Sequence, residues 1–85
     1  MDRDEAEEAL IPLLASTQAT LPNVDLGDVP DLIEMHEWNV ALENLCSHLG
    51  DQNEGICPSG IYPVLIAVAQ GLGIDRRYWS GLRVG

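Results

Sequence analysis

Apolar residues recur at helical spacing in four segments of the chain. The buried side of an amphipathic helix follows the pattern i, i+3, i+4, i+7, i+8, i+11. The segment 38–49 fills all six positions of this pattern, and so does the segment 61–72. We therefore predict two helices that pack against each other through these faces. The positions are Trp38, Ala41, Leu42, Leu45, Cys46 and Leu49 in one stripe, and Ile61, Val64, Leu65, Val68, Ala69 and Leu72 in the other.

A further helix is predicted near the start of the chain, but a proline interrupts it. Because proline has no backbone N–H and its ring clashes with the preceding turn, Pro12 predicts either a kink or a split into two pieces. Residues 21–27 then break the periodicity and predict a loop. The matching positions of this helix are Ala6, Ala9, Leu10, Leu13, Leu14 and Thr17.

A short helix is predicted to follow this loop. Asp28 is a favourable N-cap residue, and Pro30 suits the first turn. The apolar face of this helix ends at His36, which we therefore expect to be half-buried; its members are Val29, Leu32, Ile33 and His36. That face does not continue onto the stripe that starts at Trp38, so a bend is expected at residues 37–39.

Glycines and capping residues predict where the later helices end and begin. Gly50 is the expected stop of the helix that starts at Trp38, and Gly71 and Gly73 are the expected end of the next one. Residues 51–58 form a polar connection. Ser59 is the candidate N-cap of the fourth helix, although Pro63 leaves its start open over about one turn.

The end of the chain predicts one more helical turn, at residues 75–79. Asp75 is its expected cap, and Tyr78 and Trp79 are expected to lie over the core. No strand alternation or internal repeat occurs. We therefore predict one all-α domain over residues 1–85, a small bundle of four helices with a short C-terminal helical turn, with residues 1–5 frayed.

The chain is strongly and unevenly acidic. It contains 14 acidic and four basic residues, which gives a formal net charge of -10. Residues 1–54 contain 13 carboxylates and one arginine, a net charge of -12, whereas residues 55–85 contain one carboxylate and three arginines, a net charge of +2. Such a field repels phosphates and attracts basic surfaces. We expect a basic protein as the partner and no direct binding of nucleic acid.

Acidic residues recur every three positions along the second predicted helix and continue along and after the third. Such residues commonly form a solvated helix face. Here their mutual repulsion is almost uncompensated within residues 1–54, which favours a partner that relieves it. Glu43 has two open roles, a contact with the partner or an ion pair with Arg76 or Arg77. The candidate partner-binding residues are Asp31, Glu34, Glu37, Glu43, Asp51 and Glu54.

The sequence indicates no catalytic or metal chemistry. His36, Cys46, His48 and Cys57 lack the close pair spacing of structural zinc ligands, and Cys46 lies on an apolar stripe. No nucleophile elbow, phosphate-binding glycine loop or metalloprotease motif occurs. A chain of 85 residues has room for one modest core and for no deep cofactor pocket. We expect no enzymatic activity, no metal and no cofactor.

The expected location is the cytoplasm. The first residues are acidic where an export signal carries positive charge, and no apolar run is long enough to span a membrane. We expect the two cysteines to be reduced thiols.

Three short runs of the chain resemble the MafI-type bacterial immunity proteins. They are Asp31-Leu32-Ile33-Glu34, Glu37 followed by Ala41-Leu42-Glu43-Asn44-Leu45-Cys46, and Ile74-Asp75-Arg76-Arg77-Tyr78-Trp79, and together they span about residues 28–79. Members of that family are small cytoplasmic helical proteins. Each binds the C-terminal domain of a polymorphic toxin encoded beside it, frequently a nuclease, and blocks it. The resemblance implies an immunity function and a cognate toxin domain as partner.

Other functions remain open at this point. The alternative to the immunity function is an acidic adaptor or regulatory subunit that binds a basic protein. A third, weaker possibility is a DNA mimic, which requires carboxylates spaced like duplex phosphates. Gene neighbourhood separates the first two functions, because an immunity protein is encoded next to its toxin.

Overall fold

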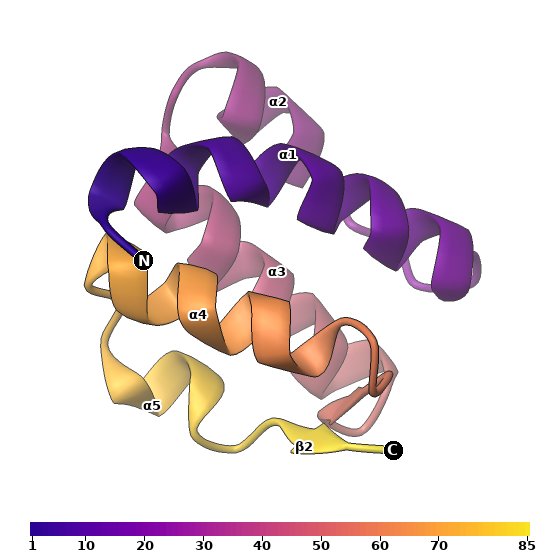
Figure 1. Ribbon diagram of the computed structural model, residues 1–85. Coiled ribbons are helices and arrows are strands. Elements are labelled where there is room, and N and C mark those ends of the chain that lie inside the picture. The colour runs from indigo at the N-terminus through magenta and orange to yellow at the C-terminus, as the bar shows by residue number, and fades with distance from the viewer.

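The computed structural model describes residues 1–85 and is mainly α-helical, as predicted (Figure 1). It also contains a pair of strands, each of two residues, that the sequence did not predict. The helices are α1 (Arg3–Thr20), α2 (Val29–Glu34), α3 (Trp38–Gln52), α4 (Tyr62–Leu72) and α5 (Arg76–Trp79). The strands are β1 (Ile56–Cys57) and β2 (Arg83–Val84). No helix combines the length and the apolar character needed to cross a membrane.

The helices pack mainly in two pairs, α1 with α4 and α2 with α3 (Figure 1). A single cluster of 20 buried apolar residues connects α1, α2, α3 and α4, and Tyr78 and Trp79 of α5 pack against it. The predicted contact between α3 and α4 is present, but the main neighbour of α4 is α1. Gly71 contributes to this preference, because a Cβ atom there would lie only 2.8 Å from the Cβ atom of Ala6 on α1. The two helices therefore approach more closely than larger residues would allow.

Helix α1 continues through Pro12, so the predicted split is wrong. The proline ring is exposed, whereas Leu10 before it and Leu13 after it are buried. Burial of one face on both sides of the proline holds the helix together. The helix begins at Arg3, within the segment expected to fray, because the Asp2 carboxylate accepts a hydrogen bond of 2.8 Å from the backbone N–H of Glu5.

The link between α2 and α3 contains the predicted bend, but His36 does not face the core. Its φ is 59°, in the left-handed region, and its side chain is exposed. Its ring stacks on the ring of Trp38, with centroids 5.2 Å apart. The chain leaves the helical path after Glu34, so the helical spacing that placed His36 on the buried face no longer applies there.

Several predicted helix ends shift by a few residues. Helix α3 runs through Gly50 and ends at Gln52. The Gln52 side-chain amide donates a hydrogen bond to the backbone carbonyl of Asp25 and accepts one from the backbone N–H of Asp25, both at 2.7 Å. This anchor holds the last turn of α3 beyond the glycine. Helix α4 begins after Ile61, so Ser59 is not its cap.

Other predicted ends are confirmed. Gly73 ends α4 with a φ of 71°, and Asp75 caps α5 by accepting a hydrogen bond of 2.9 Å from the N–H of Arg77. Gly71 is the penultimate residue of α4 and does not terminate the helix. Asp28 precedes α2 but makes no side-chain cap, since its carboxylate accepts a hydrogen bond from Asn44 at 3.2 Å.

The C-terminal segment returns to the connection between α3 and α4. There β2 pairs in parallel with β1, and Arg83 donates its N–H to the carbonyl of Gly55 at 2.9 Å. Leu82, just before β2, is buried in the core. Strands of two residues are too short to show alternation, so the hydrophobic pattern could not predict this pairing.

Candidate protein-interaction surface

The six acidic residues predicted to bind a partner do not form one patch. Asp31, Glu34 and Glu37 lie on α2 and just after it, and all three are exposed. Asp51 and Glu54 lie at the opposite end of α3, a helix of 15 residues that is about 20 Å long. The first three residues and the last two therefore belong to separate regions of the surface.

Glu43 lies apart from both groups and is half-buried on α3. It forms no ion pair with either arginine of α5, since the one ion pair of the structure joins Arg3 Nε to Glu7 Oε2 at 3.0 Å. A hydrogen bond to the Tyr78 hydroxyl contributes most to raising the pKa of Arg77, and the charges of Asp75 and Glu43 add to this rise. Glu43 thus faces the basic end of the molecule without pairing with it.

The arginines of α5 contact aromatic rings instead of carboxylates. The guanidinium of Arg76 lies 5.8 Å from the ring centroid of Trp79, and that of Arg77 lies 5.0 Å from the ring centroid of Tyr78. Cation–π contacts of this kind are individually modest. Neither arginine forms an ion pair with a carboxylate of residues 1–54.

The structure also forms an acidic hollow that the sequence did not predict. It has a volume of about 250 Å³ and lies between α1 and the first residue of α3. Glu7 is partly neutralised by Arg3, whereas Asp4 and Glu8 have no ion partner. The lining residues are Asp4, Glu7, Glu8, Ile11 and Trp38.

A signal for this hollow was present in the sequence. Asp4, Glu7, Glu8 and Ile11 follow the spacing i, i+3, i+4, i+7, which places them on one side of a helix. That Trp38 closes the hollow depends on tertiary packing, which no local spacing encodes.

A set of hydrogen bonds holds the hollow together. The Arg3 guanidinium donates to the side-chain oxygen of Asn39 at 2.8 Å and to the carbonyl of Leu72 at 3.2 Å. The Asn39 amide also donates to the Leu72 carbonyl, at 3.1 Å. These bonds fasten the start of α1 to the start of α3 and to the end of α4.

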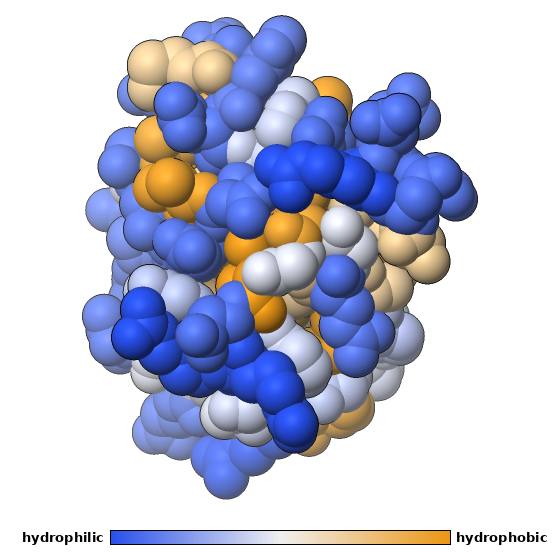
Figure 2. Space-filling view, turned by 90° about the vertical axis from the view of Figure 1, so that its left-hand side faces the viewer, coloured by the Kyte–Doolittle hydropathy of each residue, from blue (hydrophilic) through white to orange (hydrophobic).

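Figure 2 shows a hydrophilic face on which a few apolar residues are exposed.

Trp38 connects the hollow to the predicted acidic residues of α2. It is half-buried, it follows Glu37 directly in the chain, and its ring stacks on that of His36. We use the term Trp38 surface for the hollow together with Glu37, the exposed acidic residue that directly precedes Trp38. It comprises Asp4, Glu7, Glu8, Ile11, Glu37 and Trp38.

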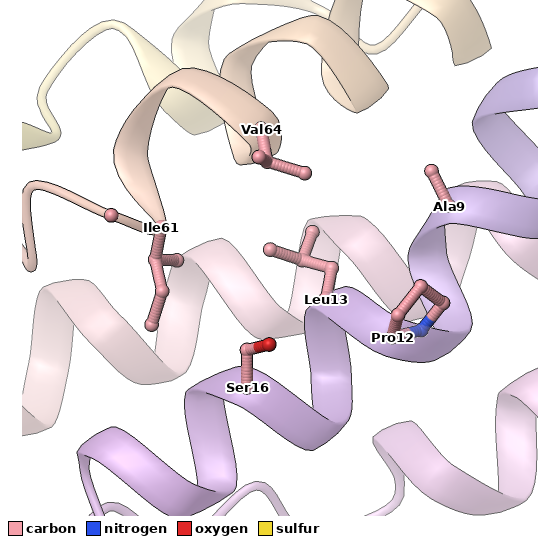
Figure 3. Close-up of a pocket in the computed structure, with 7 residues that line it drawn as sticks. Ala9, Pro12, Leu13, Ser16, Ile61 and Val64 are labelled. Carbon is pink, nitrogen blue, oxygen red and sulfur yellow. The ribbon is translucent and has the colours of Figure 1, made fainter.

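A second hollow, of about 200 Å³, lies between α1 and the start of α4 (Figure 3). Its lining carries no charged side chain, in contrast to the hollow at Trp38. It is smaller than the roughly 300–1,000 Å³ typical of small-molecule sites. We call it the apolar groove, and its lining residues are Ala9, Pro12, Leu13, Ser16, Gly60, Ile61 and Val64.

The remaining reactive groups are dispersed. Cys46 and Cys57 are buried free thiols. Burial raises the pKa of Cys57 to about 11. The pKa of Cys46 rises to about 12, mainly through burial and to a smaller extent through the nearby charges of Cys57 and Glu43. No group of three histidine, cysteine or acidic side chains lies in a metal-binding arrangement. His48 has a buried Nε2 atom without a hydrogen-bond partner, packed beside Gly27.

Comparison with protein-family models, curated proteins and solved structures gives no match for this chain. Charge, shape and the position of Trp38 are therefore the observations from which a function can be proposed.

Proposed function

We propose that this protein is an immunity protein that binds a basic toxin domain and neutralises it by covering the toxin's active or substrate-binding surface. The observation that carries the proposal is the Trp38 surface, where unpaired carboxylates surround a half-buried indole. The resemblance of residues 28–79 to MafI-type immunity proteins supports the same function. On this proposal the protein acts in the cytoplasm of the cell that it protects.

The charge of the protein suits rapid capture of a basic partner. Residues 1–54, with 13 carboxylates and one arginine, create a strongly negative field, and complementary fields raise association rates toward about 10⁸ M⁻¹ s⁻¹. Speed matters for neutralising a lethal enzyme. A nuclease binds phosphates through a basic surface, so an acidic inhibitor competes for that surface directly.

The indole supplies a contact that charge alone does not. Tryptophan is enriched among the few residues that dominate the energy of protein interfaces. An arginine or lysine side chain that enters the hollow would meet the Trp38 ring and the carboxylates of Asp4 and Glu8 together. Desolvated charge pairs of this kind are worth several kcal/mol when their geometry is complementary.

Co-expression tests this function. The protein is produced together with the C-terminal domain of the toxin that this proposal expects to be encoded beside its gene, and complex formation and cell survival are both measured. We expect a stable complex and survival of the cells. Complex formation without protection would favour the alternative, an acidic adaptor of a basic protein, and absence of a complex would contradict the proposal.

Paired charge variants locate the contact. Asp4→Asn with Glu8→Gln removes two charges from the Trp38 surface, and Asp51→Asn with Glu54→Gln removes two from the far end of α3. We expect the first pair to slow association at low salt at least fivefold and the second to change it less than twofold. Equal effects of the two pairs would show that only the net charge matters.

A further inference from the structure

The apolar groove exposes hydrophobic surface that no part of the chain covers. Figure 3 shows Val64 and Ile61 on the α4 side and Ala9, Leu13 and Ser16 on the α1 side. Val64 belongs to the predicted buried stripe, yet 41% of it is exposed. The volume of about 200 Å³ suits one side chain rather than a whole cofactor.

Hydrogen-bond acceptors border this groove on α1. Glu5 precedes Ala9 by four residues and Glu8 precedes Pro12 by four, so each carboxylate lies one helical turn before a lining residue and on the same side. Both carboxylates are exposed and neither forms an ion pair. Pro12 has no N–H, so the carbonyl of Glu8 also lacks its usual hydrogen bond within the helix. The rim therefore favours an occupant with cationic donors.

The charge of the molecule selects among the possible occupants. A second copy of this chain carries the same net charge of -10 and would be repelled. A nucleic acid or an acidic peptide would be repelled as well. A segment with an apolar side chain beside an arginine or lysine satisfies both the groove and its rim.

We propose that the apolar groove receives one apolar side chain of a basic protein, while flanking cationic side chains bind Glu5 and Glu8. This inference rests on the proposed function, because the same partner supplies both contacts. Glu8 also lines the acidic hollow, so the partner spans the exposed side of α1 between the two hollows. The apolar anchor gives the complex a contact that salt does not screen.

Two peptides and two variants of the full chain test this inference. The probes are a lysine–leucine peptide and a lysine–alanine peptide of equal length and charge, titrated into isotope-labelled protein and followed by NMR. Ser16→Leu places a larger side chain in the groove, and the control Ala15→Leu places the same leucine side chain at an exposed position outside it. Val64→Gln, at the exposed wall of the groove, is a second variant in case Ser16→Leu perturbs the fold.

We expect the lysine–leucine peptide to shift the amide signals of Ala9, Ser16 and Val64 and to bind at least threefold more tightly than the lysine–alanine peptide. Ser16→Leu should weaken its binding at least fivefold, and Ala15→Leu less than twofold. Equal affinity of the two peptides, equal behaviour of the two leucine variants, or no shifts in the groove would each overturn the inference.

The same variants separate this inference from the function on which it rests. If the toxin domain binds Ser16→Leu and Ala15→Leu equally well but loses affinity for Asp4→Asn with Glu8→Gln, the groove fails and the proposed function stands. If the toxin domain does not bind the wild-type protein, the proposed function fails. Groove binding of the lysine–leucine peptide would then keep the groove as a docking site for a basic protein other than a toxin domain.

Discussion

Residues 1–54 and residues 55–85 differ sharply in charge but build the same core. The first part carries 13 carboxylates and one arginine, and the second carries one carboxylate and three arginines. Both parts contribute fully buried leucines to one cluster, among them Leu10 and Leu45 from the first and Leu65 from the second. The two parts are therefore joined by apolar packing and not by attraction between their charges.

This difference shows how the molecule keeps its acidic surface available. Two arginines of the second part contact aromatic rings, and the one ion pair lies entirely within the first part. Burial of apolar surface supplies most of the folding free energy of a small domain, so the charges are not needed for cohesion. The acidic residues remain free for a partner at a modest cost in self-repulsion.

Removing a core leucine should have the largest effect on the packing that joins the two parts. Leu45→Ala and Leu65→Ala each delete a fully buried side chain, one from each part, and each should lower the free energy of unfolding by about 2–5 kcal/mol. Urea denaturation measures this directly. Ile11→Ala, at a residue that is 54% exposed, is the control and should change stability by less than about 1 kcal/mol. A small effect at Leu65 alone would show that the second part is only loosely attached.

The close approach of α1 and α4 provides a more local test of the same packing. A methyl group added by Gly71→Ala would meet Ala6, so we expect a loss of about 1–3 kcal/mol. Gly50→Ala is the matched control, because Gly50 lies in α3 with no atom near its Cβ position. That substitution should stabilise the protein by about 0.5–1 kcal/mol. Opposite signs in thermal unfolding are the expected result, and equal signs would contradict it.

Each part also contributes one buried thiol, and these thiols make the free energy of unfolding fall at alkaline pH. Burial raises the pKa of Cys46 to about 12 from the ordinary 9.0, so above pH 9 the unfolded chain loses this proton and the folded chain keeps it. Stability should therefore fall as pH rises from 9 toward 12, by about 1 kcal/mol per pH unit from Cys46. Cys46→Ala should show a shallower decline. Equal slopes in the two proteins would place Cys46 in contact with solvent.

Added salt should have the smallest effect on the free protein. Because the repulsion within residues 1–54 is uncompensated, 0.5 M sodium chloride should raise the free energy of unfolding by less than about 1 kcal/mol. The variant Asp51→Asn with Glu54→Gln, which carries less repulsion, should gain less from salt. A loss of stability in salt would indicate that attractive charge pairs predominate.

Much of the fold could be predicted from periodicity, because burial imposes it. The stripe of α3 is a clear case, since Ala41, Leu42, Leu45, Cys46 and Leu49 are all buried. The predictions were wrong where tertiary contacts outweighed the local preference of a single residue. Pro12 did not split α1 because burial on both sides outweighed it, and Gly50 did not end α3 because Gln52 is fastened to Asp25.

The candidate site was less accessible to prediction. The acidic character of the surface follows from composition, and Glu34 and Glu37 are exposed as expected. The acidic hollow depends on α1 meeting the start of α3, an arrangement that Arg3 holds through Asn39. Contacts between segments so far apart have no local signature, so Trp38 was predicted as a core residue and not as part of a surface.

The bond between Arg3 and the Leu72 carbonyl joins residues 69 positions apart, and it has a consequence for how the chain folds. Helices α2 and α3 are neighbours in sequence and can associate early, whereas α1 must wait for α4 before its main contacts exist. During synthesis α1 is made first, but its main packing partner α4 is made more than 40 residues later. Until α4 emerges, we expect the growing chain to expose the apolar face of α1 and to lack the α4 wall of the apolar groove.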